Sequence, residues 1–211
     1  MSTPAAARTR DAVRRGIKRR EEAASADVSR LVEAGRHLLA GDGPTRVADI
    51  VREAGVSIEA FYRYFGSKDE FVAAVAEDGG LRVAAYVERR MGEATTPEER
   101  MRAIVAGMLK QADGPQLRTS TRNILGRRGS EESHRSRNDF AHTMAALLLP
   151  VVRDLGSPDP ERDAIAATGT LVAAMESFVW SEHSPTPQDV DHLTAFLIAA
   201  VTRADGSRPR P

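Results

Sequence analysis

The sequence predicts an all-α protein of about nine helices, and three observations carry that prediction. Apolar residues recur at helical spacing along almost the whole chain. Strand signals are poor, because β-branched alternation is scarce and aromatic residues make up only 5% of the chain. Helix starts are well marked, as in Thr96-Pro97-Glu98-Glu99, where a Thr cap, a first-turn Pro and a Glu that reaches back to the cap follow one another.

Composition bounds the class of protein. The chain has 211 residues, which suits one large or two small domains. Its formal net charge is zero, so any basic surface for nucleic acid must be local. There is no cysteine, which excludes disulfides and thiolate chemistry and fits a reducing cytoplasm. No apolar run approaches the roughly 18 residues that span a bilayer. The basic N-terminus lacks the apolar core of a secretory signal, so we expect a soluble cytoplasmic protein.

The first elements in the chain are three short helical segments. An apolar stripe beginning at Val28 predicts a helix that Gly41, Gly43 and Pro44 end. Residues 45–54 predict a second helix, and Gly55 breaks the chain before a third that Ser57 caps. Two short helices joined by a Gly-containing turn are typical of a helix-turn-helix, whose second helix enters the DNA major groove.

Longer helices are predicted downstream. The capping box Ser67-Lys68-Asp69-Glu70 begins a helix to residue 92, in which Gly79-Gly80 predicts a weak point or break, since each Gly costs about 1 kcal/mol. Further helices are expected over 97–109, 140–155 (kinked at Pro150), 160–180 and 187–204. Residues 113–137 are expected to form a short helix between loops, and residues 205–211 a disordered tail.

Residues 45–75, TRVADIVREAGVSIEAFYRYFGSKDEFVAAV, with the preceding helix from Val28, resemble the tetracycline-repressor (TetR) family of bacterial transcription regulators. The match covers under a quarter of the chain. The resemblance implies an N-terminal three-helix helix-turn-helix domain and a C-terminal helical ligand-binding and dimerisation domain. We therefore expect a basic arm over 1–24, the DNA-binding domain over 25–72, the ligand-binding domain over 73–204 and the tail over 205–211.

The first turn of the third helix is the candidate base-reading element. Ser57 can cap the helix and leave its hydroxyl near a phosphate. Ile58, Glu59 and Ala60 follow it into the groove. A Glu there can accept from cytosine N4, and Ile or Ala can touch a thymine methyl. The alternative for Glu59 is that it only stabilises the positive helix N-terminus.

A second group of residues is predicted to contact the DNA backbone. Tyr62 and Tyr64 have hydroxyls that can reach phosphates, against the alternative of plain surface aromatics, and Arg63 can contact a base or a phosphate. Lys68 is a phosphate candidate by charge and by resemblance. Members of the family often carry Thr-Val-Arg-Asp where this chain has Arg46-Val47-Ala48-Asp49, so Arg46 is expected to replace the contact missing at Ala48, with Val47 nearby. Phe61 and Phe65 are expected in the core.

The N-terminus is locally cationic. Residues 1–20 hold seven basic residues and one acidic residue, a formal net charge of +6 in a chain whose total is zero. Such arms lie in the minor groove or along phosphates, and each neutralised phosphate adds about −0.9 to the log–log salt slope. The alternative is a solvated tail or a surface helix with no role in binding.

The C-terminal helices are expected to supply a dimer interface and a ligand pocket. The last two helices resemble the pair through which the family dimerises; a plain intramolecular core is the competing explanation. Pocket-lining candidates, each of which singly fits an ordinary core residue as well, are Met101, Ile104, Met108, Phe140, Met144, Leu147, Met175 and Phe178. Polar anchors could come from Arg122, Asn123, His134 and His142. The five histidines lack close metal-ligand spacing, so neither a metal nor a cofactor is expected.

The sequence thus predicts a homodimeric regulator that represses transcription by binding double-stranded DNA at paired half-sites in the cytoplasm, on the nucleoid. As the resemblance implies, a small-molecule effector would release it, with Gly79-Gly80 as a compliant point between domains. The alternatives are an activator or a ligand-independent DNA binder, and, from another class, a helical-bundle enzyme or carrier. Enzyme signatures such as a P-loop, a nucleophile elbow or HExxH are absent from the sequence.

Overall fold

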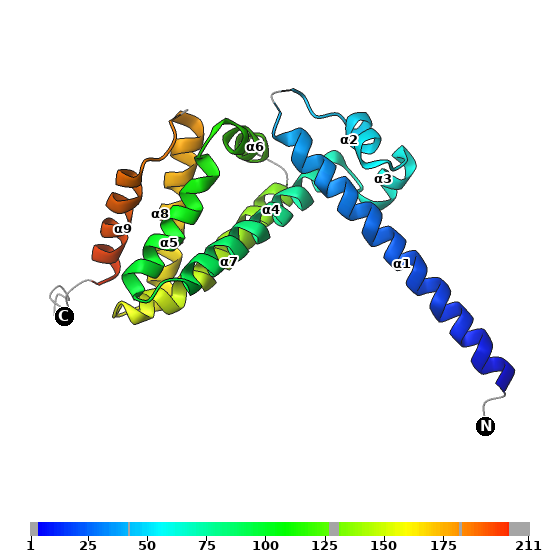
Figure 1. The fold of residues 1–211 in the computed structure, drawn as a ribbon, viewed down its shortest axis with the longest axis horizontal. Coiled ribbons are helices and arrows are strands. Elements are labelled where there is room, and N and C mark those ends of the chain that lie inside the picture. The colour runs from blue at the N-terminus through cyan, green and yellow to red at the C-terminus, as the bar shows by residue number, and fades with distance from the viewer. Residues whose placement is uncertain (1–3, 42, 127–130, 182, 203–211) are drawn as a thin grey trace.

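The computed structural model describes residues 4–41, 43–126, 131–181 and 183–202, and within them all side chains except those of residues 4–10 and 12. These residues form nine α-helices, one short 3-10 helix and no strand, which confirms the all-α prediction (Figure 1). The elements are α1 (Pro4–Leu39), α2 (Val47–Ala54), α3 (Ile58–Tyr64), α4 (Lys68–Gly92), α5 (Pro97–Leu109), η1 (Lys110–Ala112), α6 (Pro115–Leu125), α7 (Glu131–Asp154), α8 (Pro160–Ser181) and α9 (Pro187–Val201).

Two separate hydrophobic cores share helix α4. Its first turns give Phe71, Val72 and Val75 to an N-terminal core built with α1, α2 and α3. Its later turns give Ala84 and Val87 to a C-terminal core built with α5, α7, α8 and α9. One continuous helix therefore connects the helix-turn-helix domain to the C-terminal helices. The predicted boundary between residues 72 and 73 lies inside α4 and stays a prediction.

The N-terminal core is centred on three phenylalanines. The ring centroids of Phe61 and Phe71 lie 5.2 Å apart, and those of Phe65 and Phe71 lie 5.1 Å apart. All three side chains are buried, which confirms the core role expected for Phe61 and Phe65. Gly55 ends α2 at φ 63° and ψ 38°, a left-handed conformation that suits glycine. The turn and the aromatic cluster together fix how α3 is presented.

Helix α1 is much longer than expected. The predicted arm does not form a separate segment, because residues 4–24 continue the helix that carries Leu31 into the core. This N-terminal part of α1 projects away from the rest of the protein (Figure 1). Its described basic side chains, among them Arg14, Arg15 and Lys18, are exposed. Its role in DNA binding stays a prediction, and the expected tail over 205–211 lies outside the described residues.

Helix α4 runs unbroken through Gly79-Gly80, so the expected break is wrong. Gly80 of this pair permits close packing instead, whereas a Cβ on Gly79 would meet nothing within 4 Å. A Cβ on Gly80 would lie 3.0 Å from Cδ2 of Phe140, so the absence of a side chain lets α7 approach α4. Residues 113–137 also contain more helix than expected, because α7 begins at Glu131.

The length and apolar composition of α8 depart from the expectation that no segment resembles a membrane span. Within the described ranges it is the one helix long and apolar enough to cross a membrane, by length and composition only. Its alanines, together with larger apolar residues such as Ile165, Leu171 and Val179, raise its mean hydropathy. A third (33%) of the qualifying stretch is buried inside the protein, and core helices of soluble proteins pass the same test, so the evidence for a span is weak.

Candidate DNA-binding surface and ligand cavity

The N-terminal turn of α3 is presented to solvent. Ser57 has extended backbone, and its Oγ accepts a hydrogen bond from the backbone N–H of Ala60 at 3.1 Å, as a helix cap does. Glu59 is exposed, and Ile58 is 46% exposed. Ala60, in contrast, is buried because its side faces the core beneath the helix. The structure therefore does not offer Ala60 to a base, and the accessible side chains of this turn are Ser57, Ile58 and Glu59.

Glu59 is held in its charged form. Its own backbone N–H and the Ser57 hydroxyl both hydrogen-bond its carboxylate and hold its pKa below the ordinary value. An ionised carboxylate is acceptor-only, which matches the N4 amino donor of cytosine. The same contacts place negative charge at the positive end of α3, so the two roles considered for Glu59 are compatible.

The two tyrosines of α3 have different surroundings. Tyr62 is 54% exposed, with its ring edge-on to Phe61 and no hydrogen-bond partner for its hydroxyl among the described residues. The hydroxyl of Tyr64 instead donates to Oδ2 of Asp27 on α1 at 2.9 Å. The Arg63 guanidinium lies 5.0 Å from the centre of the Tyr64 ring. Tyr64 therefore fastens α3 to α1, whereas Tyr62 is available to a phosphate.

The remaining DNA-contact candidates lie at the starts of α2 and α4. The Lys68 ammonium donates to the backbone carbonyl of Thr45, which ties the start of α4 to the start of α2. An ammonium has three donors, so this bond leaves the phosphate role of Lys68 a prediction. Arg46 is exposed at the N-cap of α2. Val47 is half-buried and packs on the N-terminal core, so it supports α2.

Removal of the two tyrosine hydroxyls separates these roles. Tyr62→Phe should weaken DNA binding by about two- to tenfold with unchanged unfolding free energy, because only a phosphate donor is removed. Tyr64→Phe should lower the free energy of unfolding by about 1 kcal/mol, because Oδ2 of Asp27 loses the donor that joins α3 to α1. Fluorescence anisotropy on bound DNA and urea unfolding measure the two effects. Equal affinity of Tyr62→Phe and the parent protein would contradict the phosphate contact.

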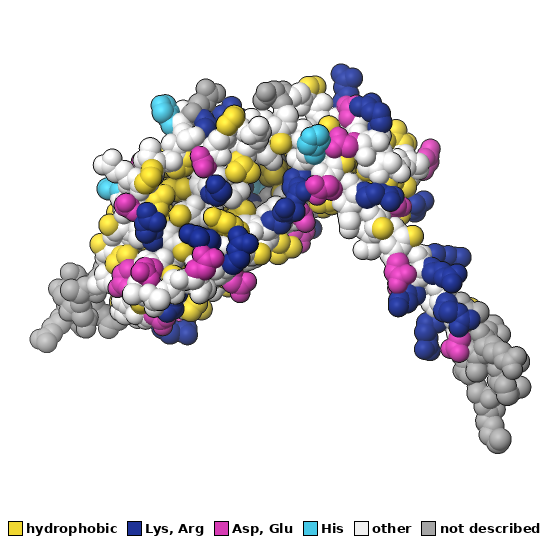
Figure 2. Space-filling model, viewed as in Figure 1, with side chains coloured by type: hydrophobic (Ala, Val, Ile, Leu, Met, Phe, Trp, Pro, Cys, Tyr) yellow, Lys and Arg dark blue, Asp and Glu magenta, His cyan; other side chains and the backbone are white. Residues whose placement is uncertain are grey.

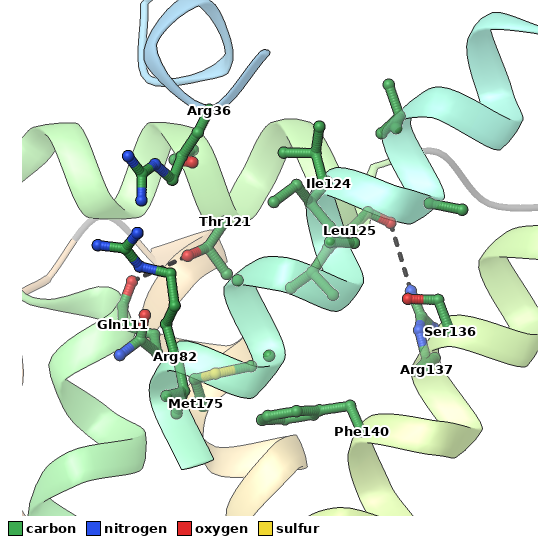
Figure 3. A pocket seen from close by; sticks show the side chains of 18 of the residues that line it. Arg36, Arg82, Gln111, Thr121, Ile124, Leu125, Ser136, Arg137, Phe140 and Met175 are labelled. Atoms are coloured by element: carbon green, nitrogen blue, oxygen red, sulfur yellow. Dashed lines mark hydrogen bonds between the residues drawn. The ribbon is translucent and has the colours of Figure 1, made fainter. Parts of the chain in front are cut away.

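A cavity of about 480 Å³ lies where the two domains meet. Its walls come from α1, α4, η1, α6, α7 and α8, and Figure 3 shows side chains such as Arg82, Thr121 and Phe140 around it. Gly79 and Gly80 form part of the α4 side. Apolar side chains such as Tyr86, Phe140 and Met175 line it together with arginines. This size and mixed lining are typical of a small-molecule site.

Sequence reasoning found two of the lining residues. Phe140 and Met175 line the cavity, whereas the other six candidates do not. Met101, Ile104, Met108 and Met144 are fully buried in the C-terminal core, and Leu147 and Phe178 pack on that core, because those faces contact neighbouring helices. The arginines Arg36 and Arg82 were missed. Val75, Gly79 and Arg82 share one helix face by their i, i+4, i+7 spacing, which could have indicated the α4 wall.

Helix α6 contacts both the cavity and the DNA-binding domain. Thr121 and Ile124 line the cavity. The Asn123 side-chain amide donates to the carbonyls of Leu39 at 2.9 Å and Gly41 at 3.3 Å, at the end of α1. Asn123 is therefore a link between domains and not a ligand anchor.

The other polar candidates also lie off the cavity. Arg122 donates to the carbonyl of Val179 at 3.0 Å and stacks near Trp180, which docks α6 on α8. His134 and His142 are exposed outside the cavity wall. Among the residues that the structure describes, no His, Cys, Asp and Glu side chains cluster as metal ligands would.

Comparison with known proteins agrees with this geometry. Residues 31–75 match the family of bacterial regulatory proteins called the tetR family. None of the curated protein sequences compared with the chain matches it significantly.

Solved structures share the fold across most of the chain. A transcriptional regulator from Rhodococcus sp. Rha1 is 22% identical with a TM-score of 0.63, over 82% of this chain and 95% of the other. A TetR-family regulator from Streptomyces coelicolor is 16% identical with a TM-score of 0.62, over 85% and 97%. The regulator FadR from Bacillus subtilis, in complex with stearoyl-CoA, is 16% identical with a TM-score of 0.63, over 82% and 97%. The segment over residues 31–75 thus carries the helix-turn-helix of the tetR family of bacterial regulatory proteins, and most of the chain shares its fold with solved transcriptional regulators.

Proposed function

We propose that this chain is a homodimeric repressor that binds paired DNA half-sites in the cytoplasm and is released by a small-molecule effector. The exposed first turn of α3 carries the proposal. Ile58 and Glu59 face solvent with the chemistry of base readers, and Tyr62 stands beside them as a backbone anchor. The buried phenylalanine cluster holds that surface rigid before DNA arrives, which lowers the entropy cost of docking.

The outer faces of α8 and α9 support a dimer. Ile165 is 65% exposed and Phe196 is 54% exposed. Ala166, Gly169 and Ala173 are exposed beside them, and such small residues permit close helix approach. An intramolecular core would have buried these apolar side chains. Exposed apolar residues on both helices fit a subunit interface, and two copies would present two recognition helices to the paired half-sites.

The cavity favours effector control over ligand-independent binding. Helix α6 borders the cavity with Thr121 and Ile124 and holds the end of α1 with Asn123. A ligand that shifts α6 would therefore move α1 and change the spacing of the two recognition helices. The effector must bind the DNA-incompetent state more tightly for release to occur. The FadR–stearoyl-CoA complex supports a ligand-responsive role for a fold of this kind.

A gel-shift titration with the DNA that flanks the chain's own gene tests the proposal. We expect a sequence-specific shift that weakens steeply with salt, and a solution mass near twice 22.9 kDa by light scattering. Scrambled DNA of equal length is the control. Equal binding to both DNAs would instead favour a helical-bundle enzyme or carrier. Reporter transcription in the presence of the protein separates a repressor from an activator.

A further inference from the structure

We propose that the cavity takes an amphipathic anion: an aliphatic chain that ends in a carboxylate or phosphate group, with the charged head held between Arg36 and Arg82. This inference rests on the proposed effector role of the cavity and adds the chemical class of the ligand and its orientation. Both guanidinium groups reach over the same side of the cavity in Figure 3.

The charge of the lining is uneven. Three arginines, Arg36, Arg82 and Arg137, line the cavity with a single acid, Glu176. Glu176 already interacts with another group of the protein. Arg82 has no acidic partner among the described residues, and Arg137 donates only to the carbonyl of Leu125, at 3.4 Å. The cavity therefore has an excess of positive charge, which an anionic ligand would balance.

Arg36 has a partner that a ligand can displace. Its guanidinium pairs with Glu33 on the same helix, but the Glu33 side chain is 68% exposed. Such surface pairs contribute between zero and about 1 kcal/mol, because water and salt screen them. The Arg36 side chain itself is only 28% exposed. A carboxylate or phosphate in the cavity would meet Arg36 in a drier setting, where charge-assisted hydrogen bonds are stronger.

The rest of the lining suits an aliphatic chain. Phe140, Met175 and Val172 supply apolar lining, and Gly80 presents backbone without a side chain. Figure 3 shows the Phe140 ring on the side of the cavity away from the two guanidinium groups. Methionine adapts to flexible aliphatic groups. The volume of about 480 Å³ lies within the ordinary range for small-molecule sites. The aliphatic chain and the charged head of the ligand would thus contact different sides of one cavity.

The charged head of the ligand would lie between the DNA-binding domain and the later part of α4. Arg36 belongs to α1 of the DNA-binding domain, whereas Arg82 lies on the later part of α4. One anionic group that bonds both would restrain α1 against α4. A neutral ligand in the same apolar space would not form that link.

Isothermal titration calorimetry on the full chain tests the inference with three probes below their micelle concentrations: decanoate, decyl phosphate and decanol. Decanoate, decyl phosphate or both should bind about tenfold or more tightly than decanol, and the tighter of the two anions identifies the head. Arg82→Gln and Arg36→Gln should each remove most of that advantage and leave decanol binding unchanged. Arg90→Gln is the matched control on α4, because Arg90 lies off the cavity and pairs with Glu93.

Equal binding of decanol and both anions would overturn the inference, as would failure of all three probes to bind, or an equal loss of anion and decanol affinity in Arg82→Gln. Gel shifts on the same samples keep the two proposals distinct. Selective anion binding without a sequence-specific DNA shift would leave the site standing and remove the repressor role. A sequence-specific DNA shift without anion selectivity would leave the repressor role standing and remove the anion site.

Discussion

Gly35→Ala is expected to destabilise the N-terminal domain and abolish DNA binding. Gly35 lies where α1 crosses α4, and a Cβ there would meet Cζ of Phe71 at 2.4 Å and Cγ2 of Val75 at 2.9 Å. Phe71 is fully buried against Phe61 and Phe65, so its ring has no space into which to retreat. Overpacking of this kind costs about 1–3 kcal/mol or more, and it would tilt α1 away from the support of α3.

Gly16→Ala is the matched control, because Gly16 lies on the same helix and its Cβ would meet nothing within 4 Å. Alanine there should favour the helix by about 1 kcal/mol locally, leave the N-terminal domain folded and retain DNA binding. Urea unfolding and anisotropy with bound DNA measure both variants. A Gly35→Ala protein with parental stability would show that α1 and α4 can separate at no cost, contrary to the packing described above.

Local capping signals predicted the starts of α3, α4 and α5 and the end of α2. The capping box at Thr96 forms as expected, and a second one forms at Thr186; in each, the Thr side chain and the third helical residue bond each other's backbone. Ser57 and Ser67 cap α3 and α4, and Gly55 ends α2. All these interactions join residues a few positions apart, which a sequence shows directly.

Long-range partners could not be predicted in the same way. Tyr62 and Tyr64 looked equivalent in sequence, but the hydroxyl of Tyr64 bonds Asp27, which lies 37 positions away. The ammonium of Lys68 likewise meets the carbonyl of Thr45. Only the packing of α1, α2 and α4 against one another brings these groups together.

The cavity shows the same limit. Met108 and Met175 have the same chemistry in sequence, yet Met108 is fully buried in the C-terminal core and Met175 lines the cavity. Gly79-Gly80 is equally ambiguous, since a glycine pair can end a helix or admit a neighbour, and Phe140 from a distant helix decides between them. Periodicity finds the inner face of a helix, but it does not show where neighbouring helices leave a space.

The helical extension of α1 is expected to contribute strongly to DNA affinity. Figure 2 shows Lys and Arg side chains along the projecting helix, where Arg14, Arg15 and Arg19 are exposed. Core contacts of α1 begin only at Val28, so deletion of residues 1–20 should leave the N-terminal domain folded. The log–log salt slope should flatten by about 0.9 for every phosphate that the shortened protein leaves unneutralised, and DNA affinity should fall by about tenfold or more at low salt.

A variant with Arg14, Arg15 and Arg19 all changed to Gln separates the effect of the charges from the effect of removing the helix. Glutamine has a helical propensity close to that of arginine, so the helix is kept. If the charges act on phosphates, this variant should reproduce most of the effect of the deletion, and both should weaken specific and nonspecific DNA by similar factors. Lys18 is left unchanged because it lies 3.8 Å from Glu22 and is partly neutralised. Anisotropy titrations from about 50 to 200 mM salt give the slopes. An unchanged slope in the shortened protein would mean that the extension points away from DNA, and the base contacts of α3 would then carry specificity without it.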